Sequence, residues 1–176
     1  MKKLNRREFV KKLKKIKLLA VDVDGVLTDD SIYFGPDGFE LKKFNISDGF
    51  FMVLAMRAGL ELAIVSGRYS PATDTRMKDL GVKHVLQGKK DKVEMIRPLL
   101  QELGIDFAEV AFVGNELLDI KLAKQVGLPI AVADANRELT RETAYVTVNK
   151  GGCGAIREIL EDYFEAVGID PKDLIK

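Results

Sequence analysis

Cysteine is nearly absent from this sequence, and long apolar runs are missing. Cys153 is the only cysteine, which excludes a disulfide within one chain and favours a reducing compartment such as the cytoplasm. No stretch of about 18 apolar residues occurs, so we expect no membrane-spanning segment. The net charge is only +1, so no overall field favours nucleic acid or an anionic membrane. These absences predict a cytoplasmic protein that binds neither nucleic acid nor a membrane.

Positive charge is nevertheless concentrated at the N-terminus. Residues 2–17 are rich in lysine and arginine, with Phe9, Val10 and Leu13 interleaved at helical spacing. This pattern predicts a short amphipathic helix whose basic face is solvated. An arm that binds anions or a membrane is the alternative.

Strand-like and helix-like segments alternate along the rest of the chain. The 176 residues suit one domain, residues 1–176, with a single core. The alternation predicts an α/β fold with a mostly parallel sheet that helices cover on both faces. In such sheets, ligands bind outside the carboxyl ends of the strands. The expected strands are 17–23, 60–65, 82–86, 110–113, 129–132 and 144–147, and the expected helices are 47–58, 70–81, 90–103, 117–126 and 154–167.

Three local signals add detail to this pattern. Apolar segments flank Gly35-Pro36-Asp37-Gly38, which predicts a small β-hairpin insert over about residues 31–44. Ser47 is expected to cap the helix that follows the hairpin. Pro98 lies inside the expected helix 90–103, where it predicts a kink or a break.

Asp22 and Asp24 stand at the carboxyl end of the first expected strand. Two carboxylates on a buried run are costly unless they hold a cation or perform chemistry. Gly25 lets the chain turn, so that the second acid can face the same pocket as the first. One carboxylate can then attack phosphorus, while the other exchanges a proton with the leaving oxygen and with water.

Further polar groups follow other expected strands. Ser66-Gly67-Arg68 offers a hydroxyl and a glycine-turn amide that can bind a phosphoryl oxygen. Lys92 opens a helix, where its ammonium can neutralise a phosphate. Gly114-Asn115-Glu116 and Asp119 form an acidic loop, whose oxygens together with Asp22 suit Mg²⁺.

The order of these motifs resembles the haloacid dehalogenase-like superfamily of phosphohydrolases. The residues that carry the resemblance are Asp22–Thr28, Ser66-Gly67-Arg68, Lys92 and Gly114-Asn115-Glu116 with Asp119. The resemblance implies a Rossmann-like three-layer fold with Asp22 as nucleophile and Asp24 as general acid and base. It also implies that Ser66 and Lys92 hold the phosphoryl group, with Mg²⁺ bound by Asp22, the Asp24 main chain and the acidic loop, Asn115 and Asp119. The segments between these motifs leave no room for a cap domain.

A narrower resemblance, over residues 16–165, is to the 3-deoxy-D-manno-octulosonate 8-phosphate phosphatases of lipopolysaccharide precursor synthesis. It rests on Asp22–Thr28, Phe44–Gly49, Val65–Arg68, Gln87–Lys92, Val132–Asp134 and Gly151–Glu158. That family is capless and tetrameric, with its hairpins packed at the subunit interface, so the resemblance implies a homotetramer in which subunits cover one another's sites. It implies that the sugar-acid phosphate is bound by Asn45, Ser47, Asp48, Gly49, Gly67, Arg68, Arg76 and Glu116.

The sequence departs from that family in the acidic loop. Asn115 and Glu116 stand where paired aspartates are usual, and the same pattern is similar to the phosphatase-like module of animal acylneuraminate cytidylyltransferases. Cys153 and Val53 also replace basic residues that are common in the family. Two alternatives to the sugar-acid phosphatase therefore stay open: a phosphatase for an acylneuraminate 9-phosphate, and a catalytically weak oligomerisation module. Retention of Asp22, Asp24, Ser66 and Lys92 together argues against the second.

Overall fold

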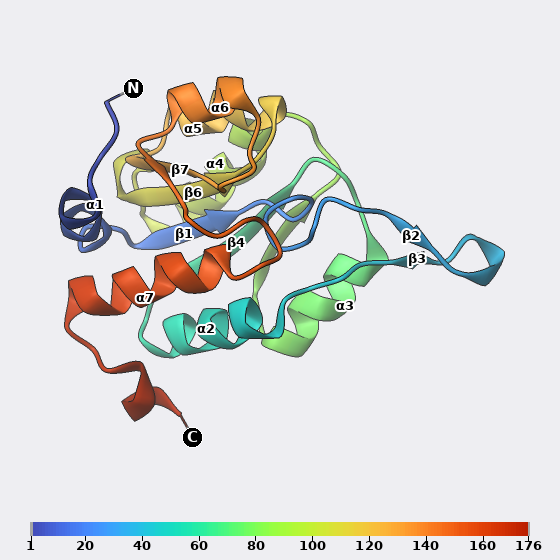
Figure 1. Cartoon of the computed structure of the whole chain (residues 1–176), viewed down its shortest axis with the longest axis horizontal. Helices are drawn as coiled ribbons and strands as arrows, with labels where there is room; N and C mark the ends of the chain where they lie inside the picture. The colour runs from blue at the N-terminus through green and yellow to red at the C-terminus, as the bar shows by residue number, and fades with distance from the viewer. Residues whose placement is uncertain (1, 176) are drawn as a thin grey trace.

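A central sheet of six parallel strands organises residues 2–175, which the computed structural model describes. The strand order is β5-β4-β1-β6-β7-β8, and helices lie on both faces (Figure 1). The α/β prediction is therefore confirmed, while the assignment of residues 1–176 to one domain stays a prediction. The strands are β1 (Leu18–Val21), β4 (Glu61–Ser66), β5 (His84–Gln87), β6 (Val110–Gly114), β7 (Leu128–Ala131) and β8 (Tyr145–Val146).

Strand β1 lies inside the sheet, between β4 and β6. Its last residue, Val21, is in register with Ile64 on one side and Val113 on the other. The chain adds β4 and β5 on one side of β1 and then β6, β7 and β8 on the other. The loops at the carboxyl ends diverge where the order reverses, which leaves a crevice for a ligand. The three loops that carry Asp22, Ser66 and Asn115 all start at this edge.

The residues of β1 alternate between two apolar cores, which is why its whole run is buried. Leu19 and Val21 pack with one group of helices, while Leu18 and Ala20 pack with the other. The first group is α1 (Arg6–Leu13), α2 (Ile46–Arg57), α3 (Pro71–Leu80) and α7 (Ala155–Val167). The second is α4 (Lys92–Leu103), α5 (Ile120–Ala123) and α6 (Arg137–Glu142). Short 3-10 turns are η1 (Pro36–Gly38), η2 (Phe107–Glu109), η3 (Leu117–Asp119) and η4 (Pro171–Leu174).

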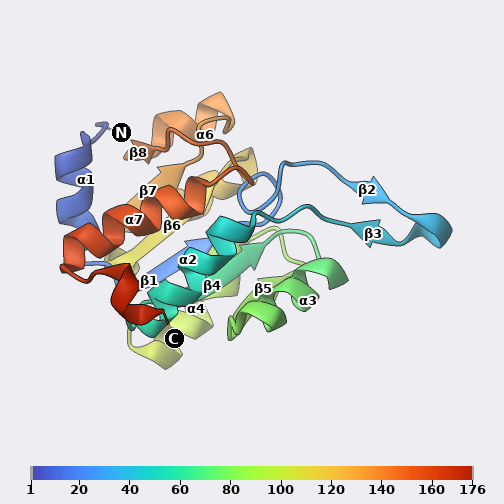
Figure 2. The same ribbon diagram turned by 60° about the horizontal axis from the view of Figure 1, so that its bottom comes forward.

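The predicted hairpin projects from the body of the molecule (Figures 1 and 2). Its strands, β2 (Tyr33–Phe34) and β3 (Glu40–Leu41), are antiparallel, and η1 closes the tip. The strands are shorter than expected, but the insert itself is confirmed. Its apolar side chains are exposed, above all Phe34 at 72% and Phe39 at 65%.

The basic N-terminal segment forms the expected amphipathic helix, α1. Phe9 and Leu13 are buried, and the ring of Phe9 stacks on Tyr145 with centroids 3.8 Å apart. The lysines on the other side of the helix stay exposed. No helix among residues 2–175 is long and apolar enough to cross a membrane.

The expected cap of α2 was wrong by two residues. Asn45, not Ser47, is the N-cap, because its side-chain oxygen accepts hydrogen bonds from the N–H groups of Ser47 and Asp48. Both residues are good caps, so the sequence pattern did not separate them. Helix α2 consequently starts at Ile46.

Of the kink or break expected at Pro98, the break is absent, since α4 runs without interruption through the proline. The proline removes one hydrogen bond to the carbonyl of Glu94. Both Glu94 and Pro98 are exposed, so water can satisfy that carbonyl. Buried residues on either side, Ile96 and Leu99 among them, hold the helix on the sheet.

Two regions differ from the expected helices. The segment expected as helix 117–126 starts as the 3-10 turn η3 and continues only as the short helix α5. Helix α6 was not predicted at all, because residues 133–143 have no apolar periodicity. It is capped by the Asn136 side chain and anchored by the buried Leu139.

Candidate active site

The loops after β1, β4 and β6 surround a cavity of about 370 Å³ at the carboxyl edge of the sheet. The expected convergence of distant motifs is therefore present in the structure. The residues that line the cavity are Asp22, Asp24, Asp30, Ser66, Gly67, Arg68, Lys90, Lys92, Asn115, Glu116, Leu118 and Asp119.

A tight turn after β1 presents the two aspartates. The carbonyl of Val23 accepts hydrogen bonds from the N–H groups of Leu27 at 2.9 Å and Thr28 at 3.2 Å, which closes the loop. Gly25 has a φ of +76°, and a Cβ there would lie 1.9 Å from Asn115 Nδ2. Only glycine therefore lets the first loop approach the third one so closely.

Lys92 lies buried between two carboxylates. Its side chain is 2% exposed, and its Nζ is 2.9 Å from Asp22 Oδ2 and 2.5 Å from Asp119 Oδ1. Burial disfavours the charged form of Lys92, but the two ion pairs outweigh it and raise its pKa. The ammonium group thus links the loop after β1 to the loop after β6 through the start of α4.

The carboxyl group of Asp22 lines the cavity and is held by a backbone hydrogen bond. Its Oδ1 accepts a hydrogen bond from the Val23 N–H at 2.7 Å. Burial raises the pKa of Asp22 to about 7, against the opposing effect of Lys92. Additional positive charge beside Asp22 favours the ionised form that a nucleophile requires.

Asp24 is held by two cations. Lys42 Nζ contacts Asp24 Oδ1, and Arg68 Nε donates to Asp24 Oδ2 at 3.3 Å. Lys42 belongs to the end of the hairpin, so the insert reaches the site within its own chain. Sequence reasoning did not select Lys42, because a lysine beside another lysine in a surface hairpin carries no distinctive signal.

Ser66 ends β4 and turns its hydroxyl back onto its own loop. Its Oγ donates to the Arg68 carbonyl at 3.0 Å and accepts from the Arg68 N–H at 3.4 Å. Gly67 lies between them on the cavity wall. The arrangement places the Ser66 hydroxyl and the Gly67 backbone in the lining of the cavity, where the hydroxyl can bind a phosphoryl oxygen once it leaves the Arg68 carbonyl.

The carboxylate of Asp119 holds the acidic loop in place through hydrogen bonds to its backbone. Its Oδ2 accepts the N–H groups of Asn115 at 2.8 Å and Glu116 at 3.0 Å, while its Oδ1 pairs with Lys92. Gly114 is required here, because a Cβ would lie 2.5 Å from Asp119 Oδ2. Glu116 caps the turn η3 and lines the cavity.

Asn115 has the one feature that suits a cation most directly. It is 6% exposed, and its Oδ1 is a buried oxygen with no hydrogen-bond partner among the described residues. An unsatisfied buried oxygen costs free energy unless another group compensates it. A hard divalent cation is such a group.

The charge of the cavity leads to the same conclusion. Its described lining carries five carboxylates against three cationic side chains, an unfavourable surface for a phosphate dianion. No group of three or more histidine, cysteine, aspartate or glutamate side chains within residues 2–175 forms a ready metal cluster. The buried neutral oxygen of Asn115, beside the carboxylate of Asp22, is a candidate ligand for a cation here.

Five of the expected substrate-binding residues lie outside this cavity. Asn45 caps α2, Ser47 is exposed beside it, and Gly49 packs on Arg76 of α3. The carboxylate of Asp48 is buried and accepts the Arg157 N–H at the start of α7 at 2.7 Å. These residues line one flank below the hairpin rather than the pocket of their own chain.

Sequence reasoning also missed an acid at the rim. Asp30 lines the cavity with a φ of +64°. Burial and the neighbouring carboxylates of Asp24 and Glu116 raise the pKa of Asp30. A left-handed aspartate in a polar loop has no signature in the sequence, so it could not have been found there.

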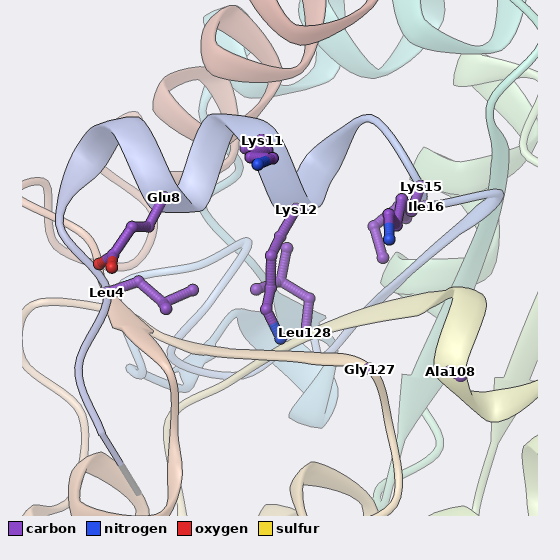
Figure 3. Close-up of a pocket in the computed structure, with 9 residues that line it drawn as sticks. All are labelled: Leu4, Glu8, Lys11, Lys12, Lys15, Ile16, Ala108, Gly127 and Leu128. Carbon is purple, nitrogen blue, oxygen red and sulfur yellow. The ribbon is translucent and has the colours of Figure 1, made fainter.

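A second cavity, of about 390 Å³, shares no lining residue with the first and is drawn in Figure 3. It is bounded by α1 and by the residues that precede β1, β6 and β7, at the amino edge of the sheet. Lys11, Lys12 and Lys15 stand at its rim over an apolar floor that includes Leu128. Glu8 is its single carboxylate, so it lacks the pair of acids that the first cavity offers for attack on phosphorus and for proton exchange.

Comparison with known proteins identifies the family of this chain. A profile of haloacid dehalogenase-like hydrolases matches residues 82–160. The 3-deoxy-D-manno-octulosonate 8-phosphate phosphatase of Escherichia coli (strain K12) is 41% identical over 154 residues, which are 88% of this chain and 82% of that protein. The chain belongs to this phosphatase family. It is accordingly a phosphatase, and the expected superfamily and narrower family are both confirmed.

Solved structures of the same family share the fold closely. The Moraxella catarrhalis phosphatase, in complex with magnesium, phosphate and its sugar acid KDO, has a TM-score of 0.89 at 36% identity, covering 93% of this chain and 94% of that one. The Yersinia pestis enzyme has a TM-score of 0.89 at 38% identity, covering 92% and 87%. The phosphatase fold is therefore retained over nearly the whole chain.

The Asn115 oxygen generates a direct prediction about metal binding. Asn115→Asp replaces a neutral ligand oxygen with a carboxylate, so Mg²⁺ should bind roughly tenfold more tightly. Isothermal titration of Mg²⁺ into the protein without substrate measures this. Asn5→Asp adds the same charge at the exposed cap of α1 and should leave the affinity unchanged. Unchanged or weaker binding by Asn115→Asp would remove Asn115 from the ligand set.

Proposed function

We propose that this phosphatase hydrolyses 3-deoxy-D-manno-octulosonate 8-phosphate with the help of Mg²⁺. The observation that carries the proposal is Asp22, held by Lys92 at the floor of the cavity, with Asp24 two residues further along the same turn. The relatives named above act on this substrate or hold its product. Arg68 supports the assignment, because a guanidinium at the cavity wall suits the carboxylate of a sugar acid.

The first step forms a phosphoryl-enzyme on Asp22. A carboxylate oxygen of Asp22 attacks phosphorus, and the bond from phosphorus to the sugar oxygen breaks. Asp24 gives its proton to that leaving oxygen, which departs as the free sugar alcohol. Lys92 and the Ser66 loop surround the phosphoryl group as it moves.

The second step returns the enzyme to its starting state. Asp24, now a carboxylate, takes a proton from a water molecule whose oxygen attacks the phosphorus on Asp22. The bond between Asp22 and phosphorus breaks, and inorganic phosphate leaves. The proton on Asp24 is then in place for the next cycle, so one water is consumed for each ester cleaved.

The metal site is proposed to consist of Asp22, the Asp24 main-chain carbonyl and the Asn115 side chain. Asp119 lies behind Asn115, with its oxygens engaged by Lys92 and the loop N–H groups. When bound, Mg²⁺ supplies positive charge that offsets the charge of the phosphoryl group in transfer. The cavity's excess of carboxylates supports this requirement.

The assembly is proposed to be a homotetramer formed through the hairpin. Its exposed Phe34 and Phe39 are the kind of apolar surface that a second copy of the chain would cover. In such an assembly the flank that carries Asn45, Ser47, Gly49 and Arg76 would face a neighbouring subunit's pocket and complete it. A cytoplasmic location is part of the same proposal.

A nucleophile variant tests the proposed reaction. Asp22→Asn should lower kcat for the 8-phosphate by more than about 1000-fold, because an amide cannot attack phosphorus. Phosphate release in Mg²⁺ is the measurement, with the remote, exposed Asp173→Asn in η4 as control. Full turnover by Asp22→Asn would rule out the covalent route. A wild-type preference for an acylneuraminate 9-phosphate would favour the alternative substrate.

A hairpin variant tests the proposed assembly. Phe34→Ser combined with Phe39→Ser should convert the tetramer to smaller species in sedimentation velocity, since it removes the apolar contact without touching the core. Val148→Ser, at a position 83% exposed away from the hairpin, should leave the tetramer intact. A monomeric wild type, or a tetrameric double variant, would contradict assembly through the hairpin.

A further inference from the structure

The side chain of Lys42 is buried, although it lies at the base of a hairpin whose strands are largely exposed. Its side chain is 1% exposed, although Leu41 and Lys43 on either side of it are exposed. Burying an ammonium group is unfavourable unless charged partners compensate it. Lys42 Nζ contacts Asp24 Oδ1 and lies 3.7 Å from Glu40 Oε1. The hairpin therefore contributes a buried ammonium group that pairs with Asp24, the proposed acid–base residue of the site.

Glu40 connects this cation to the second one. It accepts hydrogen bonds from both terminal nitrogens of Arg68, the longer at 3.2 Å, and from Ser70 Oγ at 2.8 Å. The bonds from Arg68 lower the pKa of Glu40 to about 2, so it is ionised. Since Arg68 also donates to Asp24, the four side chains of Asp24, Lys42, Glu40 and Arg68 form a closed ring of alternating charge in the state in which Asp24 is ionised.

The two cations on Asp24 are not equivalent. Arg68 lines the cavity, and its side chain is 38% exposed, so it can turn to an anionic group of the substrate. Lys42 is almost completely buried and does not line the cavity. If Arg68 turns to the substrate, Lys42 stays on Asp24 Oδ1, while Oδ2 loses its donor and is free to carry the proton for the leaving oxygen.

We propose that Lys42, with Glu40 behind it, is a positioning residue that holds Asp24 at the leaving oxygen for acid catalysis. The inference rests on the phosphatase function proposed above and adds a role for the hairpin within its own subunit. Lys42 touches neither the phosphoryl group nor the nucleophile. It acts through the orientation of the Asp24 carboxyl group alone.

Two substrates with different leaving groups can distinguish a positioning role of Lys42 from a purely structural role. A sugar alkoxide is a poor leaving group and needs the proton from Asp24, whereas p-nitrophenolate leaves well without it. The constant kcat/KM covers the steps up to departure of the leaving group. A misplaced Asp24 should therefore slow the sugar phosphate far more than p-nitrophenyl phosphate, while general damage to the fold should slow both equally.

The experiment compares Lys42→Met with Lys43→Met in saturating Mg²⁺. Lys42→Met should lower kcat/KM for the sugar 8-phosphate by about 100-fold or more and for p-nitrophenyl phosphate by less than about tenfold. Lys43 is 66% exposed and pairs only with Asp29 at 3.4 Å among the described contacts, so its variant should match wild type on both. Glu40→Gln, which keeps the size of the side chain, should also lower kcat/KM more for the sugar 8-phosphate than for p-nitrophenyl phosphate. This second variant tests the inference if Lys42→Met does not fold.

Three results would overturn the inference. An equal loss of kcat/KM on both substrates would mean that Lys42 supports the fold and does not position Asp24. No loss of kcat/KM on either substrate would mean that Lys42 has no role in the reaction. In both cases the proposed phosphatase function stands. A wild-type enzyme that hydrolyses neither ester in Mg²⁺ defeats the proposed function and this inference together.

Discussion

The buried ammonium group of Lys92 is the interaction on which the site depends. It joins Asp22 after β1 to Asp119 after β6, and Asp119 in turn fixes the loop of Asn115 through two N–H groups. Without that charge, two carboxylates would share a buried space with no cation between them. The loops of three strands keep their mutual position because Lys92 satisfies both acids at once, and the parallel sheet supplies the edge at which they meet.

The two ends of the hairpin differ in what they contact. Its tip exposes apolar side chains, whereas its base contributes Lys42 and Glu40 to the ring of charges around Asp24. Under the two proposals above, one insert would serve assembly through its tip and catalysis through its base. Within residues 2–175, the hairpin thus reaches the acid–base residue of its own chain.

The sequence predicted the parts of this molecule that have short-range signals. Strand runs such as Leu18–Val21 and the aspartates that follow them were recognised, and so were the hairpin and its Gly-Pro-Asp-Gly turn. It did not predict contacts that depend on three-dimensional packing. Lys42 looked like a surface lysine until the fold buried it against Asp24. Pro98 looked like a helix breaker, but its exposed position on a well-anchored helix made it tolerable. The unpaired oxygen of Asn115 could be seen only once the neighbouring loops were in place.

The most direct measurement is the free energy of unfolding of Lys92→Met in urea, with a chelator present to remove metal. Lys89→Met, three residues earlier and exposed, is the control. If Lys92 neutralises Asp22 and Asp119 as described, its loss should lower the stability by about 3–5 kcal/mol, because two buried charges lose their partner, while Lys89→Met should change it by less than about 0.5 kcal/mol. Equal stability of the two variants would contradict the account.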